Sequence, residues 1–297
     1  MNVSRVTEAD SPLIAAILNA ITQEQYGESD LTEADVVTWF AHNELEVLLA
    51  EEDGQVVGYG DRWREEARDR SWLDVRARAG RGDAGTTLLT ELERRSAPDV
   101  DRGALSMGYV SSVDETMRDV FEAAGYESIR ASYRMSIALD TPSPPEWPAG
   151  IAVGTFRPED EALVHAAHQE SFRDHWEHKN ETIEEWRKWM IGSPQFDPSL
   201  WFVAREGEEV AGISLCTVHS SGNVEHGFCR VLAVRRPWRR RGLALALLRH
   251  SFVEMQRRGM KRASLGVDAE NLTGAVALYE RAGMHVERRS DCYSKEL

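Results

Sequence analysis

The sequence predicts an α/β (α+β) fold built from two tandem domains, each a mixed, mostly antiparallel sheet flanked by helices. Three observations support this. The chain of 297 residues is long for a single compact core. A stretch at 139–150 holds four prolines in twelve residues and has no apolar periodicity. The same order of features stands on either side of it, which predicts domains at 1–140 and 150–297 joined by a linker at 141–149.

Each half is expected to begin with a strand and one or two helices, and a hairpin follows near its middle. Residues 47–58 are VLLAEEDGQVVG and residues 201–212 are WFVAREGEEVAG, with an alanine and a glycine eight positions apart in both. Two strand-like runs joined by a short polar turn are typical of a β-hairpin.

After the hairpin, each half is predicted to continue as strand, helix, strand, helix, strand. The segment WLDVRARAGRGDAGTTLL at 72–89 matches VLAVRRPWRRRGLALALL at 231–248. The last helix of each half ends on a glycine, Gly125 or Gly283, where a helix C-terminus favours glycine. The spacing of the repeat stays between 154 and 159 residues, which indicates a tandem duplication.

The composition argues against several classes of protein. A formal net charge of −15 disfavours nonspecific nucleic-acid binding, which depends on neutralising phosphates. No apolar run is long enough to span a bilayer, and the first residues do not resemble a signal peptide. The three cysteines, Cys216, Cys229 and Cys292, are widely spaced and form no C-x-x-C pair. We therefore expect a cytoplasmic protein without disulfides, nucleic acid or membrane partners.

The loop that follows the strand at 228–234 is predicted to bind a phosphate-rich anion. Five arginines lie within 235–241, and the apolar positions from 244 to 255 recur at helical spacing. Unpaired N–H groups and the helix dipole favour an anion at the first turn of such a helix. Gly242 and Ala244 allow close approach to the backbone, so the segment suits a pyrophosphate.

Two segments carry a resemblance to a known family. The segment RRRGLA at 239–244 resembles the Q/R-x-x-G-x-G/A signature of the GNAT acetyltransferases, and LGVDAENLTGAVALYERAGM at 265–284 resembles their late strand and helix. The resemblance is sharpest over 225–284. It implies two tandem GNAT domains, similar to mycothiol synthase and its relatives, and acetyl-CoA as co-substrate.

The resemblance also implies roles for individual residues in a direct transfer within a ternary complex. Tyr279 would hydrogen-bond or protonate the departing coenzyme A thiolate. A backbone N–H near Leu232 would polarise the thioester carbonyl. The residues expected to bind the cofactor are Leu232, Ala233, Val234, Arg239, Arg240, Arg241, Gly242, Leu243, Ala244, Asn271, Ala275 and Leu278.

The general base is left open by the sequence. An amine must lose a proton before it attacks, and GNAT enzymes often carry a glutamate on the strand before the loop. Here Phe228 and Arg230 occupy the corresponding strand positions. Glu225 or His226, at the start of that strand, is therefore the candidate base, directly or through water.

The acceptor is expected to bind against the segment 165–190, which holds four histidines and three tryptophans. Phe172, His175 and Trp176 would form a wall, and Asp174 would attract an ammonium group. The histidine spacing also permits a metal site on one helical face, or a solvated or core face. We expect no metal, because the chemistry implied by the resemblance needs none.

The first half lacks the residues that carry the resemblance. The positions opposite Arg239, Gly242, Ala244, Asn271 and Tyr279 hold Gly80, Asp83, Gly85, Val113 and Phe121. An aspartate in the anion cradle would repel a phosphate, since two like charges about 4 Å apart cost on the order of 1–4 kcal/mol. We therefore expect a degenerate, inactive N-terminal domain, kept for architecture or to wall the acceptor site.

The predicted function is an acetyl-CoA-dependent N-acetyltransferase of a small-molecule amine, acting as a monomer or homodimer. One alternative is a protein or peptide N-acetyltransferase, which would need an open groove. The other is a noncatalytic acyl-CoA-binding sensor. The tryptophan-rich segment favours an enclosed site, and retention of Tyr279 and Asn271 in one half favours catalysis.

Overall fold

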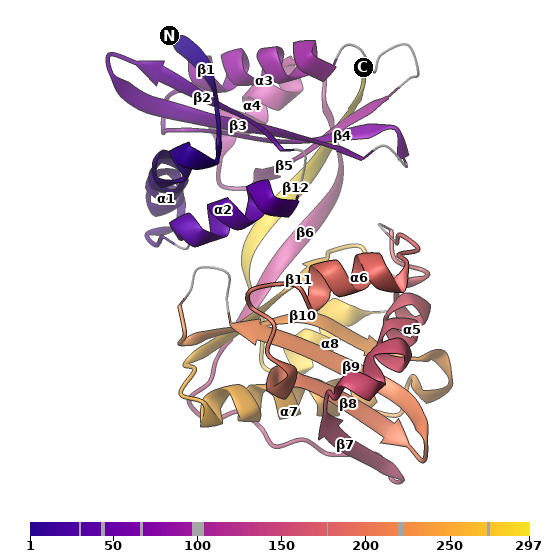
Figure 1. Ribbon diagram of the computed structural model, residues 1–297. Helices are drawn as coiled ribbons and strands as arrows, with labels where there is room; N and C mark the ends of the chain where they lie inside the picture. The colour runs from indigo at the N-terminus through magenta and orange to yellow at the C-terminus, as the bar shows by residue number, and fades with distance from the viewer. Residues whose placement is uncertain are drawn as a thin grey trace. The chain divides into compact units, whose positions relative to one another are not determined.

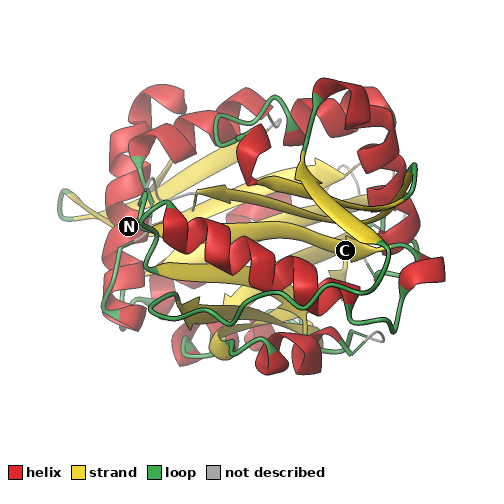
Figure 2. Cartoon of the chain, turned by 90° about the horizontal axis from the view of Figure 1, so that it is seen from below, coloured by secondary structure: helices red, strands yellow, loops and turns green. Residues whose placement is uncertain are grey.

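The computed structural model describes residues 1–29, 31–42, 45–65, 68–96, 104–176, 178–218, 223–271 and 274–297. They form two compact units (Figure 1). Unit 1 comprises residues 1–132 and 288–297, and unit 2 comprises most of residues 133–287. Both units combine helices and strands (Figure 2), which confirms the predicted mixed α/β fold.

Unit 1 is a sheet with helices on both faces. Side chains alternate between the faces of a strand, so Val47 and Leu49 pack on α1, whereas Leu48 and Ala50 pack on α3. Its elements are β1 (Asn2–Val6), α1 (Ser11–Tyr26), α2 (Glu33–His42), β2 (Glu46–Glu52), β3 (Gln55–Glu65), β4 (Arg70–Ala77), α3 (Gly82–Ser96), β5 (Leu105–Ser111), α4 (Glu115–Ala123) and the first part of β6 (Glu127–Ala138).

Unit 2 repeats this plan with its own core. Val164 of α5, Trp186 of α6 and Val231 of β10 share one apolar cluster, and α7 and α8 pack on the other face of the sheet. Its elements are the end of β6, then β7 (Ile151–Thr155), α5 (Glu161–Phe172), α6 (Ile183–Met190), β8 (Trp201–Glu206), β9 (Glu209–Val218), β10 (His226–Val234), α7 (Leu243–Arg257), β11 (Arg262–Asp268), α8 (Ala275–Arg281) and the start of β12 (His285–Glu296).

The sheets are mostly antiparallel, as predicted. The strand order is β1-β2-β3-β4-β5-β12 in unit 1 and β6-β11-β10-β9-β8-β7 in unit 2. The pairs β4–β5 and β10–β11 are parallel, and the other pairs described here are antiparallel.

The boundaries of the two units differ from the predicted domains 1–140 and 150–297. Residues 133–138 of β6 belong to unit 2, and residues 288–297 belong to unit 1. The reason is a strand pairing between distant parts of the chain, because residues 290–296 of β12 pair with β5. The proline-rich stretch 139–150 contains neither helix nor strand, but it does not mark which sheet a neighbouring strand joins.

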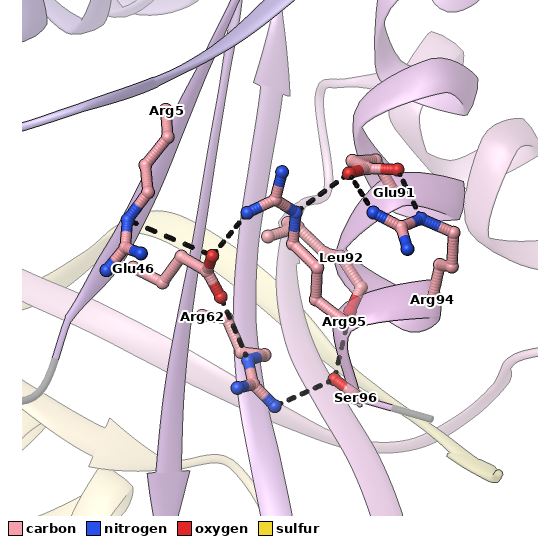
Figure 3. Close-up of polar contacts among 8 residues, drawn as sticks. All are labelled: Arg5, Glu46, Arg62, Glu91, Leu92, Arg94, Arg95 and Ser96. Atoms are coloured by element: carbon pink, nitrogen blue, oxygen red, sulfur yellow. Dashed lines mark hydrogen bonds and ion pairs between the residues drawn. The ribbon is translucent and has the colours of Figure 1, made fainter. Parts of the chain in front are cut away.

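An ion-pair network holds one end of unit 1 together (Figure 3). The Glu46 carboxylate on β2 lies 2.5 Å from the guanidinium of Arg95 on α3, 3.6 Å from Arg62 on β3 and 4.0 Å from Arg5 on β1. Arg95 also pairs with Glu91 one helical turn away, at 2.8 Å. The shared Glu46 carboxylate thus links α3 to the sheet by charge-assisted contacts.

No helix in the described part of the chain is long and apolar enough to cross a membrane.

Candidate active site

The site in unit 2 is organised by an open edge of β10. This strand pairs with β9 along most of its length, but it pairs with β11 only at residues 226–228. The two parallel strands then diverge, and residues 229–234 have no partner strand on that side within the described chain. A strand edge of this kind presents backbone N–H and C=O groups to a ligand.

The direction of the N–H groups on that edge follows from one hydrogen bond. The Arg235 N–H donates to the Ala211 carbonyl oxygen of β9, at 3.0 Å. Because successive N–H groups of a strand alternate in direction, those of Leu232 and Val234 face the open edge. The alternation supports the predicted oxyanion donor at Leu232.

The loop after β10 forms an anion cradle at the start of α7. Arg240 and Gly242 adopt positive φ values of 65° and 85°. Among described residues, no backbone acceptor is found for the N–H groups of residues 240–245, and the first helical bond is donated by Ala246 to Gly242. Several free N–H groups at a helix N-terminus bind a phosphate well.

Four of the five arginines of this loop are already engaged. Arg235 pairs with Glu170 at 2.6 Å, Arg236 with Asp174 at 2.8 Å, Arg241 with Glu206 at 2.7 Å, and Arg239 donates to the carbonyl oxygens of Val234 and Ser171. Within the described chain, only Arg240 among them makes no hydrogen bond or ion pair. Arg240 is therefore the side chain that remains for a phosphate.

Tyr279 lies on α8 with only 9% of its surface exposed. Burial is the main cause that raises its pKa, and the nearby Cys229 thiol raises it further. The phenol is thus protonated at neutral pH, and its hydroxyl makes no hydrogen bond to a described residue. A buried hydroxyl in this state suits the predicted donor to a departing thiolate.

The predicted contacts of the late helix lie at the junction of β11 and α8. The Asn271 N–H donates to the Asp268 carbonyl oxygen at 3.1 Å, and Gly274, with a φ of 72°, precedes α8. Ala275 begins α8, and Leu278 packs against the same core as Tyr279. Asn271 and Ala275 therefore lie between the end of β11 and the first turn of α8, and Leu278 lies one turn further along α8.

The structure brings neither candidate base to the open edge. The Glu225 carboxylate pairs with Lys261 at 2.5 Å, and His226 Nε2 lies 2.9 Å from the Ser264 hydroxyl. Both residues stand at the far end of β10 from the cradle. His226 is about 20 Å along the strand from Leu232, at roughly 3.3 Å per residue.

The residues of the predicted acceptor wall lie at the end of α5 and in the turn that follows it. Phe172 packs on His168 with ring centroids 4.9 Å apart, and on His175 at 5.6 Å. Trp176 follows directly in the chain. Asp174 is not a free carboxylate, since it is held by Arg236.

The histidines of this segment have structural partners. Trp186 Nε1–H donates to His168 Nδ1 at 2.9 Å, and burial lowers the pKa of His168 to about 4. His165 Nε2 lies 3.0 Å from the Glu181 carbonyl oxygen. The described residues contain no group of three His, Cys, Asp or Glu side chains that could hold a metal ion.

In the corresponding loop of unit 1, several backbone N–H groups already have acceptors. Helix α3 begins at Gly82, two residues earlier in the repeat than α7. The N–H groups of Ala84 and Gly85 donate to the Arg81 carbonyl oxygen, and the Ala79 N–H donates to the Glu24 carboxylate. Asp83 forms an ion pair with Arg81. An anion would therefore find these donors occupied and a carboxylate beside them.

Comparison with known proteins identifies the family. Residues 162–284 match the Acetyltransferase (GNAT) family. A mycothiol acetyltransferase of Streptomyces bingchenggensis is 33% identical over 245 residues, which are 80% of this chain and 77% of that protein. The chain belongs to the GNAT acetyltransferase family. This GNAT protein is accordingly an acetyl-CoA-dependent N-acetyltransferase, as the sequence predicted.

Solved structures confirm the tandem GNAT architecture. A GCN5-related N-acetyltransferase from Sphaerobacter thermophilus superposes with a TM-score of 0.81 at 30% identity, covering 99% of this chain and 95% of that one. A tandem GNAT protein from the clavulanic acid biosynthesis pathway shares the fold, with a TM-score of 0.77 at 16% identity, covering 99% and 98% of the two chains.

Proposed function

We propose that this GNAT acetyltransferase transfers the acetyl group of acetyl-CoA to the amine of a small molecule, by direct attack in a ternary complex in unit 2. The observation that carries the proposal is the continuity of the open edge with the cradle. The N–H groups of Leu232 and Val234 face the open edge of β10, and the same strand continues into the loop that holds the free N–H groups of residues 240–245. Unit 1 offers no comparable cradle.

Each part of this surface has a distinct task. The N–H groups of residues 240–245 and the guanidinium of Arg240 would bind the pyrophosphate. The N–H of Leu232 would stabilise the negative charge that develops on the thioester oxygen. The amine nitrogen forms a bond to the carbonyl carbon and loses a proton to solvent. The C–S bond breaks, the sulfur receives a proton from Tyr279, and solvent returns a proton to the phenolate.

A small acceptor is favoured by the wall on α5 and α6. His168, Phe172 and Trp186 are held together by ring contacts and by the Trp186–His168 hydrogen bond. The half-buried rings of His168 and Phe172, with the fully buried Trp186 beside His168, suit a compact ligand better than an extended peptide. The relative named above is a mycothiol acetyltransferase, and a small amine is the class of acceptor that we carry over to this chain.

The test is a coenzyme A release assay with acetyl-CoA, a panel of small amines and a set of peptides with free N-termini. We expect release with at least one class of small amine, a product heavier by one acetyl group, and no turnover of peptides. Tight acetyl-CoA binding without turnover of any amine would instead support a sensor. Preference for peptides would support a protein acetyltransferase.

A further inference from the structure

The β-bulge in β10 directs an arginine toward the acceptor side of the site. The register with β9 shifts between Cys229 and Val231, so Arg230 is the extra residue of the bulge. Val231 packs in the cluster that contains Val164 of α5 and Trp186 of α6. The Arg230 guanidinium donates to the Trp189 carbonyl oxygen of α6 at 3.1 Å. Arg230 therefore faces α5 and α6, two residues before Leu232.

This guanidinium lacks the carboxylate partner that its neighbours have. Arg235, Arg236 and Arg241 each pair with a carboxylate at 2.6–2.8 Å, whereas no described carboxylate lies within 4.0 Å of Arg230. Arg230 is exposed, and the charge of Glu181 acts on it from beyond 4.0 Å. A guanidinium has five N–H donors, and one hydrogen bond to a carbonyl leaves most of them available.

A second donor contacts the same helix as Arg230. The Arg230 guanidinium donates to the Trp189 carbonyl oxygen, and His168 bonds the Trp186 indole one helical turn away on α6. Because His168 Nδ1 accepts the hydrogen bond from Trp186, the proton of the neutral ring is on Nε2. This Nε2–H makes no hydrogen bond to a described residue. The remaining N–H groups of Arg230 and the Nε2–H of His168 thus have no acceptor among the described residues.

We propose that Arg230 and His168 bind an anionic oxygen group of the acceptor, so that the substrate is a small amine that also carries a carboxylate or a phosphate. The proposal rests on the function proposed above. An anionic group supplies the negative partner that no described residue places within 4.0 Å of Arg230, and it accepts the hydrogen bond of His168 Nε2–H. Because Arg230 lies beside Leu232 in β10, binding that group would orient the amine toward the thioester carbon. Arg230 acts here as a specificity-determining residue.

The experiment compares matched acceptors with the wild-type protein and with Arg230→Gln. The panel contains α-amino acids, their carboxamides and phosphate monoesters of amino alcohols, and kcat/KM is measured by coenzyme A release. We expect the wild type to prefer one anionic class over the carboxamides. Arg230→Gln should lower kcat/KM for that class about 10- to 100-fold, mainly through KM, and leave the carboxamides unchanged. Arg230→Lys should restore part of the loss.

Two controls test whether the effect of Arg230→Gln comes only from the loss of a positive charge or from misfolding. Arg187→Gln removes a cation of α6 that pairs with Glu161, so it should keep the wild-type preference. The acetyl-CoA affinity of Arg230→Gln, measured by calorimetry, should equal that of the wild type, which also shows that the variant folds.

Four results would overturn the proposal. Equal losses for anionic and neutral acceptors, or a wild-type preference for carboxamides, would contradict it while the acetyltransferase function stands. Weakened acetyl-CoA binding by Arg230→Gln would assign Arg230 to the cofactor instead. If no amine of any class is acetylated, the proposed function fails as well, and the assay distinguishes that outcome from the others.

Discussion

At the scale of single residues, the decisive features are the polar groups left without a partner. In the loop after β10, four arginines are tied to carboxylates or carbonyl oxygens, whereas Arg240 makes no hydrogen bond or ion pair to a described residue. On α8, the hydroxyl of buried Tyr279 makes no hydrogen bond to a described residue. The sequence could indicate that arginines and a tyrosine gather here. It could not show which were free, because that depends on partners such as Glu170, Asp174 and Glu206, which are distant in sequence.

Tyr279→Phe should lower kcat about 100-fold, because the departing thiolate loses its proton donor. The affinity for acetyl-CoA should change little. Steady-state assays would measure kcat, and calorimetric titration would measure the affinity. Tyr293→Phe is the control, since it removes a buried hydroxyl of unit 1 that donates to Glu122. Unchanged kcat in Tyr279→Phe would remove the proton donor from the mechanism.

Arg240→Gln should weaken acetyl-CoA binding about 10-fold, because a charge-assisted contact to a phosphate is lost. Arg241→Gln should weaken it less, since that side chain already pairs with Glu206 at an exposed site. Calorimetric titration of the two variants provides the comparison. A larger effect at Arg241 would show that the bound cofactor rearranges these ion pairs.

At the scale of elements, the site depends on where strands and helices begin and diverge. The cradle exists because α7 begins at Leu243, after the left-handed Gly242, whereas α3 begins two residues earlier in the repeat and uses the equivalent N–H groups. The hairpins, the helix-ending glycines and this loop were predictable from local patterns. The bulge at Arg230 was not, because an extra residue in a strand leaves no periodic signal that a sequence shows.

Gly242→Asp should abolish acetyl-CoA binding, because it places a carboxylate among the phosphate donors of the cradle. Its matched control is Gly80→Asp in the equivalent loop of unit 1. Both glycines have positive φ values, 85° and 76°, and in both cases an added Cβ would meet no atom within 4 Å. The backbone strain is therefore similar, and only the Gly242 variant should lose binding. Equal loss in both would point to misfolding.

At the scale of the whole molecule, the chain is two units of one plan that differ in chemistry. The pairing of strand β12 could not be predicted from the sequence, because its residues 290–296 pair with β5, which is distant along the chain. No local feature near residues 288–297 indicates that partner, so the predicted boundary differs from the observed one. The general base is a similar case, because Glu225 and His226 were chosen by position in the sequence and lie far from Leu232 along β10.

The central claim is that only unit 2 binds and uses acetyl-CoA. Isothermal titration of the full chain with acetyl-CoA tests it most directly, because the stoichiometry counts functional cradles. We predict one equivalent per chain, lost in Gly242→Asp. Two equivalents per chain, or one equivalent that survives Gly242→Asp, would contradict the account.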